Sequence, residues 1–379
     1  MKIAIIDADL IGRNKHRFPN LVCMKLSAYH KLIGDQVKLK IDYADLNQYD
    51  KVFISKVFTD TEIPDGIINL PNVEYGGTGF FYDKAPKLPD KVEHITPDYH
   101  LYDEWVNEKL QNGGKRKDYT YYLDYSIGFL TRGCFRQCKF CVNQNYKKCV
   151  IHSNVLEFMD KDRPKLCFLD DNFFACPSWG EIIEQVKATN KRFQFKQGLD
   201  ERLLTDKKAN ELMTWRYDGD YIFAFDNIED RNVIEEKACL IRKYNKNLGQ
   251  NIKFYVLCGF DRNNRYDDAF WEQDIKDVFE RIFILAKYNF KPYIMRFEKY
   301  KTSPLYGTYV NVACWCNQPS LFNNLSYRQF CEKDDLRKSN GQGLSATWKY
   351  FEELLTFNGV FQRYVDVIPK SLVLDYSKW

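Results

Sequence analysis

Three cysteines, Cys134, Cys138 and Cys141, lie within eight residues of one another, directly after an apolar stretch at 125–130 that predicts a strand. Three thiolates this close in sequence can converge on a single soft metal centre. A four-iron cluster normally takes four thiolates, so a cluster held by these three would keep one iron open for a small molecule. The spacing therefore predicts an incompletely ligated iron-sulfur cluster.

Structural zinc is the competing interpretation of the same cysteines. Zinc would need a fourth ligand, and Cys149 is the nearest candidate. Zinc modules usually pair two short knuckles across a loop, and no second knuckle lies at a suitable distance in this sequence. A non-catalytic iron-sulfur or zinc module stays open as an alternative, but the pattern favours the open cluster.

The spacing C-x3-C-x2-C follows Thr131-Arg-Gly133 and carries Phe140 just before its third cysteine. In these features it resembles the radical S-adenosylmethionine (SAM) superfamily. The resemblance implies a [4Fe-4S] cluster whose open iron is chelated by SAM, with the Phe140 backbone near the adenine. It also implies reductive cleavage of SAM to a 5′-deoxyadenosyl radical, which abstracts hydrogen from a substrate, and an external one-electron donor such as flavodoxin or ferredoxin.

The bulk properties set broader bounds on the protein. A chain of 379 residues with 45% hydrophobic and 16% aromatic residues has the composition of a globular protein of two or three domains. No apolar run has the length of a membrane span, and the start of the chain does not resemble a secretion signal. Twelve cysteines without such a signal predict a reducing, cytoplasmic location and no membrane partner.

Charge gives little information about partners. A formal net charge of +4 is too small to indicate nucleic acid, and no basic tail follows the last predicted strand. The basic cluster Lys115-Arg-Lys117 favours a solvated loop. We therefore expect a small-molecule substrate, such as a modified nucleoside or nucleotide.

Residues 1–95 alternate apolar runs with amphipathic stretches, which predicts a small parallel sheet with crossover helices. This part resembles the Rossmann-like cobalamin-binding domain that precedes the cluster domain in many radical SAM proteins. The resemblance breaks at the metal ligand, because Asp9 stands where that family often has histidine in Asp-x-His-x-x-Gly. We therefore expect a domain without cobalamin. Gly76 and Gly77 could admit a ligand, or could simply form a tight exit from a strand.

Residues 96–120 read as a polar connector, and residues 121–300 as six alternating strands and helices. Nearly continuous apolar strands between helices predict a partial (β/α)6 TIM-type barrel, so the whole chain is expected to be α/β. Residues 301–379 are expected to form an α+β extension. Within it Cys314, Cys316 and Cys331 could hold a second metal, but a packed strand or turn explains them more simply.

The carboxyl ends of parallel strands share one face, so the polar residues that follow the predicted strands should gather there. The segment 168–173 is similar to the second-strand segment of the methylthiotransferase-like and Elongator-like branch of radical SAM enzymes. That resemblance implies contacts from its polar residues to the SAM ammonium. Helix caps and internal salt bridges are the simpler roles for such residues. The candidates for SAM binding are Asp170, Asp171, Asn172, Gln197 and Asp226, and those for a substrate phosphate are Arg202, Arg296, Gly76 and Gly77.

The overall layout resembles the radical SAM lyases of queuine salvage. This resemblance implies hydrogen abstraction from a ribose and release of queuine from a queuosine nucleotide. A cobalamin-type radical methylase or a methylthiotransferase is the alternative within the same superfamily.

Overall fold

The computed structural model describes residues 1–143, 146–246, 252–357 and 360–375. The chain divides into two compact units, Met1–Lys196 and Gln197–Trp379, and each is described by itself. Both contain parallel sheets and helices, which confirms the α/β class. The finer division at residues 95, 120 and 300 stays a prediction.

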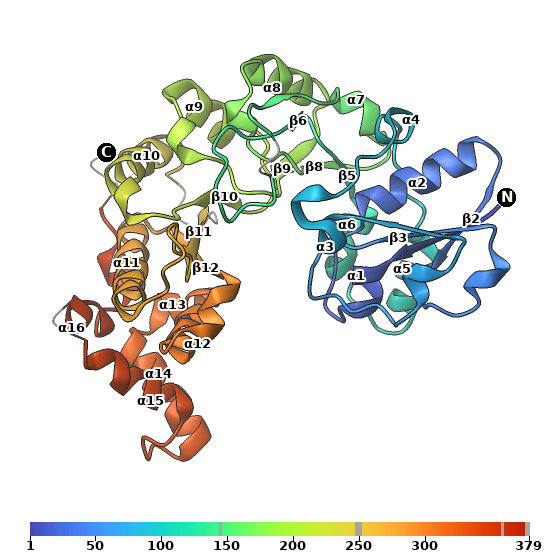
Figure 1. The fold of residues 1–379 in the computed structure, drawn as a ribbon. Coiled ribbons are helices and arrows are strands. Elements are labelled where there is room, and N and C mark those ends of the chain that lie inside the picture. The colour runs from blue at the N-terminus through green and yellow to red at the C-terminus, as the bar shows by residue number, and fades with distance from the viewer. Residues whose placement is uncertain (144–145, 247–251, 358–359, 376–379) are drawn as a thin grey trace. The chain divides into compact units, whose positions relative to one another are not determined.

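The first unit begins with a four-stranded parallel sheet in the order β2-β1-β3-β4, which confirms the sheet predicted for residues 1–95. The sheet lies in the blue part of the ribbon in Figure 1. Its central strand β1 is buried on both faces, so its apolar run is continuous rather than alternating. Ile3 and Ile5 pack against helices α2 and α5 on one face, while Ala4 and Ile6 pack against the loops on the other. The strands are β1 (Lys2–Asp7), β2 (Gln36–Lys40), β3 (Lys51–Ser55) and β4 (Val73–Gly76).

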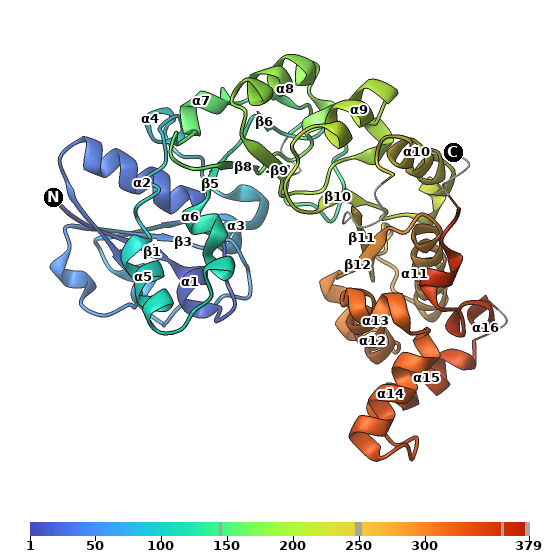
Figure 2. The ribbon, with the colours of Figure 1, turned by 180° about the vertical axis from the view of Figure 1, so that it is seen from behind.

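A second sheet in the same unit carries the cysteine segment. Its order is β5-β8-β9, all parallel, and these three strands are labelled in Figure 2. A short antiparallel pair, β6 with β7, follows β5. These strands are β5 (Tyr125–Gly128), β6 (Thr131–Arg132), β7 (Val150–Ile151), β8 (Lys165–Phe168) and β9 (Arg192–Phe195). The helices of this unit are α1 (Ala8–Gly12), α2 (Leu21–Leu32), α3 (Thr78–Phe81), α4 (Asp90–Glu93), α5 (Asp103–Gln111), α6 (Thr120–Leu123), α7 (Val155–Phe158) and α8 (Trp179–Ala188).

The second unit contains a parallel sheet in the order β10-β11-β12, covered by long amphipathic helices. Helix α11 packs on β11 and β12, and α12 packs on β12. The strands are β10 (Tyr221–Ala224), β11 (Ile252–Cys258) and β12 (Lys291–Arg296). The helices are α9 (Asp206–Thr214), α10 (Arg231–Tyr244), α11 (Asp268–Lys287), α12 (Tyr306–Cys316), α13 (Pro319–Asn324), α14 (Tyr327–Ser339), α15 (Ala346–Leu355) and α16 (Val360–Val365).

The structure bears on two predictions about architecture, the partial barrel and the α+β extension at the end of the chain. The six strands predicted for the barrel exist, but they fall into two three-stranded sheets, one in each unit, so a continuous partial barrel stays a prediction. The α+β extension is wrong, because the described residues after β12 form helices and no strand. Cys314 and Cys316 lie on helix α12 rather than in a strand or turn, Cys314 exposed and Cys316 buried.

Within the described ranges, no helix combines the length and the apolar character that crossing a bilayer requires.

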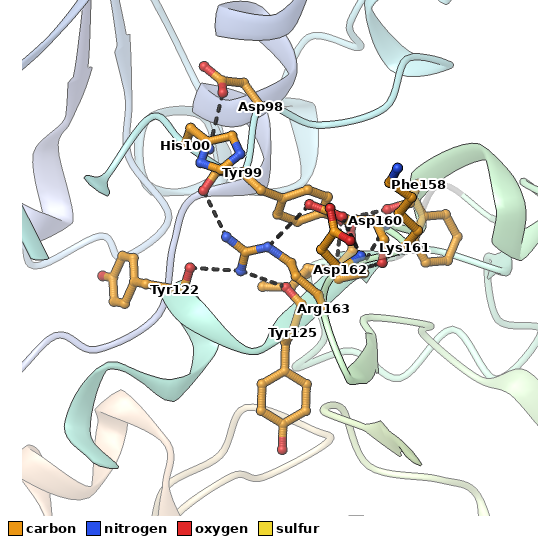
Figure 3. Close-up of polar contacts among 12 residues, drawn as sticks. Asp98, Tyr99, His100, Tyr122, Tyr125, Phe158, Asp160, Lys161, Asp162 and Arg163 are labelled. Carbon is orange, nitrogen blue, oxygen red and sulfur yellow. Dashed lines mark hydrogen bonds and ion pairs between the residues drawn. The ribbon is translucent and has the colours of Figure 1, made fainter. Parts of the chain in front are cut away.

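Arg163 forms hydrogen bonds both to residue Tyr99 of the predicted connector, 96–120, and to the start of β5. Figure 3 shows its guanidinium among backbone carbonyls: Nη1 donates to Tyr122 O at 2.7 Å and to Tyr125 O at 3.2 Å, and Nη2 donates to Tyr99 O at 2.9 Å. The Tyr99 hydroxyl in turn donates to Phe158 O at 2.7 Å. One buried cation therefore satisfies three carbonyls that have no partner in a strand or helix.

Replacing Arg163 with Met should lower the stability of the first unit by about 3 kcal/mol, because several buried carbonyls would lose their donor. Urea unfolding followed by tryptophan fluorescence measures this change. Lys161→Met removes a neighbouring exposed cation and should leave the free energy of unfolding within about 0.5 kcal/mol of the wild-type value. Equal effects of the two substitutions would contradict the role given to Arg163.

Candidate metal centre

The three cysteines lie in a loop that leaves the carboxyl end of β5. The loop is closed at its base by the β6–β7 pair, in which Thr131 faces Ile151 and Arg132 faces Val150. All three cysteines are partly exposed and none forms a disulfide. The two ends of the loop are therefore paired with each other, and the loop presents three free thiols at the edge of a parallel sheet.

Asp170, which follows the neighbouring strand β8, anchors the start of this loop. Its carboxylate accepts the backbone N–H groups of Leu130 at 3.1 Å and Thr131 at 2.6 Å, and the Thr131 hydroxyl at 2.6 Å. The side chain is fully buried, and this burial raises the pKa of Asp170 to about 7. Because β5 and β8 are adjacent and parallel, their carboxyl ends meet and bring the carboxylate to the loop.

Asp171 holds the loop on both sides of the cysteines. Its carboxylate accepts the Gly133 N–H at 2.7 Å and the Asn143 Nδ2 at 2.6 Å. Gly133 lies in the left-handed region (φ 96°), and a Cβ there would approach Lys148 O to 2.4 Å, so only glycine fits at this position. The predicted segment 170–172 thus contacts the cysteine loop, and a contact with SAM stays a prediction.

Several N–H groups point at the cysteine sulfurs. Asn172 Nδ2 lies 3.3 Å from Cys134 Sγ, and the backbone N–H of Arg136 approaches the same sulfur at 3.4 Å. The Asn143 N–H lies 3.4 Å from Cys141 Sγ. Donors directed at sulfur stabilise thiolates and are a usual feature around cluster sulfurs. The chemistry of this donor set therefore fits a thiolate-bound iron-sulfur cluster.

The thiols are not already assembled around a point. Among the described residues, no group of three or more His, Cys, Asp or Glu side chains is arranged to hold a metal ion. Cys134, Cys138 and Cys141 would have to draw together on binding. The support for a cluster site is consequently the presence of three soft sulfur ligands and the N–H groups directed at them, and not a preformed metal geometry.

Cys149, the possible fourth ligand for zinc, lies in a different environment from the loop cysteines. It is buried, and burial raises the pKa of its thiol to about 12 despite a hydrogen bond from the Thr131 side chain. A bound zinc ion would itself deprotonate a coordinating thiol, so the zinc alternative stays open.

Phe140 connects the cysteine loop to the first sheet. Its carbonyl accepts a hydrogen bond from the Tyr82 hydroxyl at 3.2 Å. Tyr82 follows helix α3 and lies in the left-handed region, with φ of 49°. The predicted position of Phe140 near an adenine stays a prediction.

The other first-unit candidates have structural explanations. Gly77 has φ of 106°, and a Cβ there would approach Lys56 O to 2.2 Å, so packing of the chain requires glycine. Asp9 is buried and accepts the Val57 N–H at 2.7 Å and the Thr61 hydroxyl at 2.5 Å. Asp9 therefore holds the loop after β3. Gly76 has space around it, with only Pro86 Cγ near a built Cβ at 4.0 Å, and phosphate binding by Gly76 and Gly77 stays a prediction.

The remaining candidates lie in the second unit, and their predicted location beside the cysteine loop stays a prediction. Arg202 donates to Asp200 at 2.7 Å and to Asp230 at 3.1 Å, which is the internal salt bridge considered as its alternative role. Arg296 is exposed and lies over the Tyr300 ring at 4.7 Å. Gln197 is exposed, whereas Asp226 is half-buried and burial raises its pKa.

Sequence reasoning missed buried charged residues of the second unit. Glu201 accepts the Ala224 N–H at 3.1 Å, and burial together with the charge of Asp200 raises the pKa of Glu201 to about 8. The Arg281 guanidinium donates to Phe225 O at 2.9 Å and to Leu257 O at 2.9 Å. The signal for Arg281 was visible in the sequence, since a lone arginine stands on the apolar face of the helix at 268–287.

No protein-family model matches the chain. No curated protein matches it. Two solved structures show a likeness: the cobalamin-dependent S-adenosylmethionine radical enzyme OxsB with aqua-cobalamin bound (9% identity, 93% of this chain, 56% of that chain, TM-score 0.35), and its apo, selenomethionine-labelled form (11%, 99%, 58%, TM-score 0.37). The chain thus spans little more than half the length of that enzyme, and TM-scores this low do not define a shared fold.

Replacing Asp171 with Ala should release the cysteine loop, because two hydrogen bonds to its carboxylate flank the three cysteines. We expect iodoacetamide to label Cys134, Cys138 and Cys141 of the metal-free protein roughly 10-fold faster, equivalent to about 1.4 kcal/mol of lost loop stability. Peptide mass spectrometry measures the rates. Asp162→Ala, which removes an exposed carboxylate of the same unit, serves as control, and unchanged labelling in both variants would refute the role of Asp171.

Glu201 should make the second unit less stable as pH rises. Its pKa of about 8 in the fold lies above its ordinary value of 4.5, so the folded state retains a proton that the unfolded state loses. The associated stability is fully present below pH 4.5, decreases progressively above it, and is lost once the pH has passed about 8. Glu201→Gln should remove this dependence, which amounts to at most about 1.4 kcal/mol per pH unit.

Urea unfolding at pH 5, 6, 7 and 8 measures the difference between the wild type and the Glu201→Gln variant. Glu332→Gln, on the exposed side of α14, is the matched control and should follow the wild type at every pH. The free energies of unfolding of the wild type and the Glu201→Gln variant could instead differ by the same amount at every pH. That result would show that Glu201 does not titrate in this range.

Proposed function

We propose that the chain is a radical SAM enzyme that binds a [4Fe-4S] cluster through Cys134, Cys138 and Cys141. The observation that carries this proposal is the closed loop at the end of β5, which presents three free thiols and is held on both sides by Asp171. Three thiolates leave one iron of such a cluster available to SAM. When bound, the cluster would supply the electron that cleaves SAM to a 5′-deoxyadenosyl radical.

The protein's own residues would position and tune this site. Asp170 and Asp171 fix the path of the loop, and Asn172 directs its amide at Cys134. These contacts favour an indirect role for the segment after β8, in which it acts on SAM through the loop. Phe140, Gln197 and Asp226 are the SAM contacts that we retain as proposals.

The proposed substrate class rests on the sequence alone. We retain abstraction of hydrogen from a small substrate, and release of queuine from a queuosine nucleotide is the specific form suggested by the layout of the chain. Arg202 and Arg296 are the proposed phosphate contacts, although Arg202 would first have to exchange its carboxylate partners. An external one-electron donor such as flavodoxin or ferredoxin completes this proposal.

A cobalamin-dependent radical methylase is the second candidate. The four-stranded parallel sheet at the start of the chain is the observation that favours it. Asp9, at the position of the usual histidine ligand, is buried and bonded to the loop after β3, so we continue to expect no cobalamin. Purification with added cobalamin, followed by absorbance spectroscopy, separates the two candidates.

Replacing Cys134, Cys138 or Cys141 with Ala should lower the bound iron of the anaerobically reconstituted protein at least 10-fold and abolish formation of 5′-deoxyadenosine from SAM with dithionite. Iron analysis and mass spectrometry measure the two effects. Cys149→Ala should retain both iron and SAM cleavage. Loss of bound zinc in all four variants, with a colourless wild type, would instead establish the zinc module.

A further inference from the structure

The cysteine loop is strongly basic in sequence. Residues 131–150 contain five Lys or Arg residues and no Asp or Glu, although the whole chain carries a net charge of only +4. This local excess lies around the three cysteines rather than in a terminal tail. The loop therefore carries a positive charge that the overall composition conceals.

Contacts in the first unit gather part of this charge around one aromatic ring. The Arg132 guanidinium lies 6.0 Å from the centre of the Tyr146 ring, and Lys87 Nζ lies 5.9 Å from the same centre. Lys147 and Lys148 follow Tyr146 directly in the chain, and Lys84 precedes Lys87 by three residues. Two segments far apart in sequence thus contribute Lys87 and Arg132 to one ring. We call these residues and their chain neighbours the basic surface: Lys84, Lys87, Arg132, Tyr146, Lys147 and Lys148.

The lysines of the basic surface are available to a partner. Lys84, Lys87, Lys147 and Lys148 are exposed, and none forms an ion pair with a described residue. Asp83, the carboxylate next to Lys84 in the chain, is half-buried. Mutual repulsion among unpaired cations is relieved when an anion binds, so the surface is suited to a partner with several negative charges.

Exposed aromatic rings accompany these cations. Phe135, in the cysteine loop, is 45% exposed, and Tyr82, which is bonded to the same loop, is 43% exposed. The Arg136 guanidinium lies 4.7 Å from the Phe135 ring centre. Cations that neutralise phosphates and aromatic faces that stack with bases together form the usual platform for single-stranded nucleic acid.

We propose that the basic surface, with Phe135 and Tyr82, binds single-stranded nucleic acid. An acidic electron-transfer protein would also meet the charge, but it would leave the exposed rings without a role, so the observations favour the polynucleotide. The proposal concerns binding alone and does not depend on the cluster or on SAM chemistry. It adds a nucleic-acid partner that the net charge of +4 was too small to indicate.

Fluorescence anisotropy of the full-length protein with a labelled single-stranded RNA of about 20 nucleotides tests the proposal. Lys147→Gln/Lys148→Gln removes two phosphate contacts and should weaken binding about 25-fold at 0.1 M salt, with a salt dependence shallower by about 1.4 logarithmic units. Lys115→Gln/Lys117→Gln makes the same change of charge at an exposed loop of the same unit and should bind as the wild type does.

A second variant separates stacking from charge. Phe135→Leu should weaken binding roughly 10-fold without changing the salt dependence. Equal losses in the two double-lysine variants, or a wild type that binds an acidic flavodoxin but not the RNA, would overturn the proposal. Equal competition by ATP at matched phosphate concentration would also overturn it, because a small phosphate ligand would then suffice. Far-ultraviolet circular dichroism confirms that each variant is folded.

Discussion

The candidate site depends on one interaction, the hydrogen bonding of the Asp170 carboxylate to the chain that leaves β5. The N–H groups of Leu130 and Thr131 are buried where the strand ends, and each would be costly without an acceptor. Burial of the carboxylate itself opposes this arrangement, as its raised pKa of about 7 shows. The three hydrogen bonds offset that penalty and fix the direction in which the cysteine loop begins.

Strand β5 is only four residues long and is held at both ends by buried charged side chains. Arg163 donates to the carbonyl of Tyr125 at its first residue, and Asp170 accepts from Leu130 just beyond its last. Arg281 binds carbonyls at the ends of two strands of the second unit in the same manner. Short strands cannot supply partners for all their terminal backbone groups, and single charged side chains complete the hydrogen bonding.

The cysteine loop combines thiols with positive charge. N–H groups are directed at Cys134 Sγ and Cys141 Sγ, as they are around the sulfurs of iron-sulfur clusters. Arg132, two residues before Cys134 in the chain, lies over the Phe129 ring and can still meet an external anion. The proposed cluster site and the proposed nucleic-acid surface are therefore compatible uses of one loop.

The sequence by itself determined the local features of this protein. The apolar runs predicted the strands, since a parallel strand buried on both faces must be nearly continuously apolar. The cysteine spacing predicted a metal site in the loop after β5, which stays a prediction. Only the tertiary structure decided what the polar residues after the strands do. Asp170 and Asp171 were predicted to contact a cofactor, which stays a prediction. Their partners within the chain are backbone N–H groups and side chains of the cysteine loop, which no spacing in the sequence reveals. The charge around Tyr146 was hidden for the same physical reason: Lys87 and Arg132 are far apart in the chain, and only folding brings them to one ring.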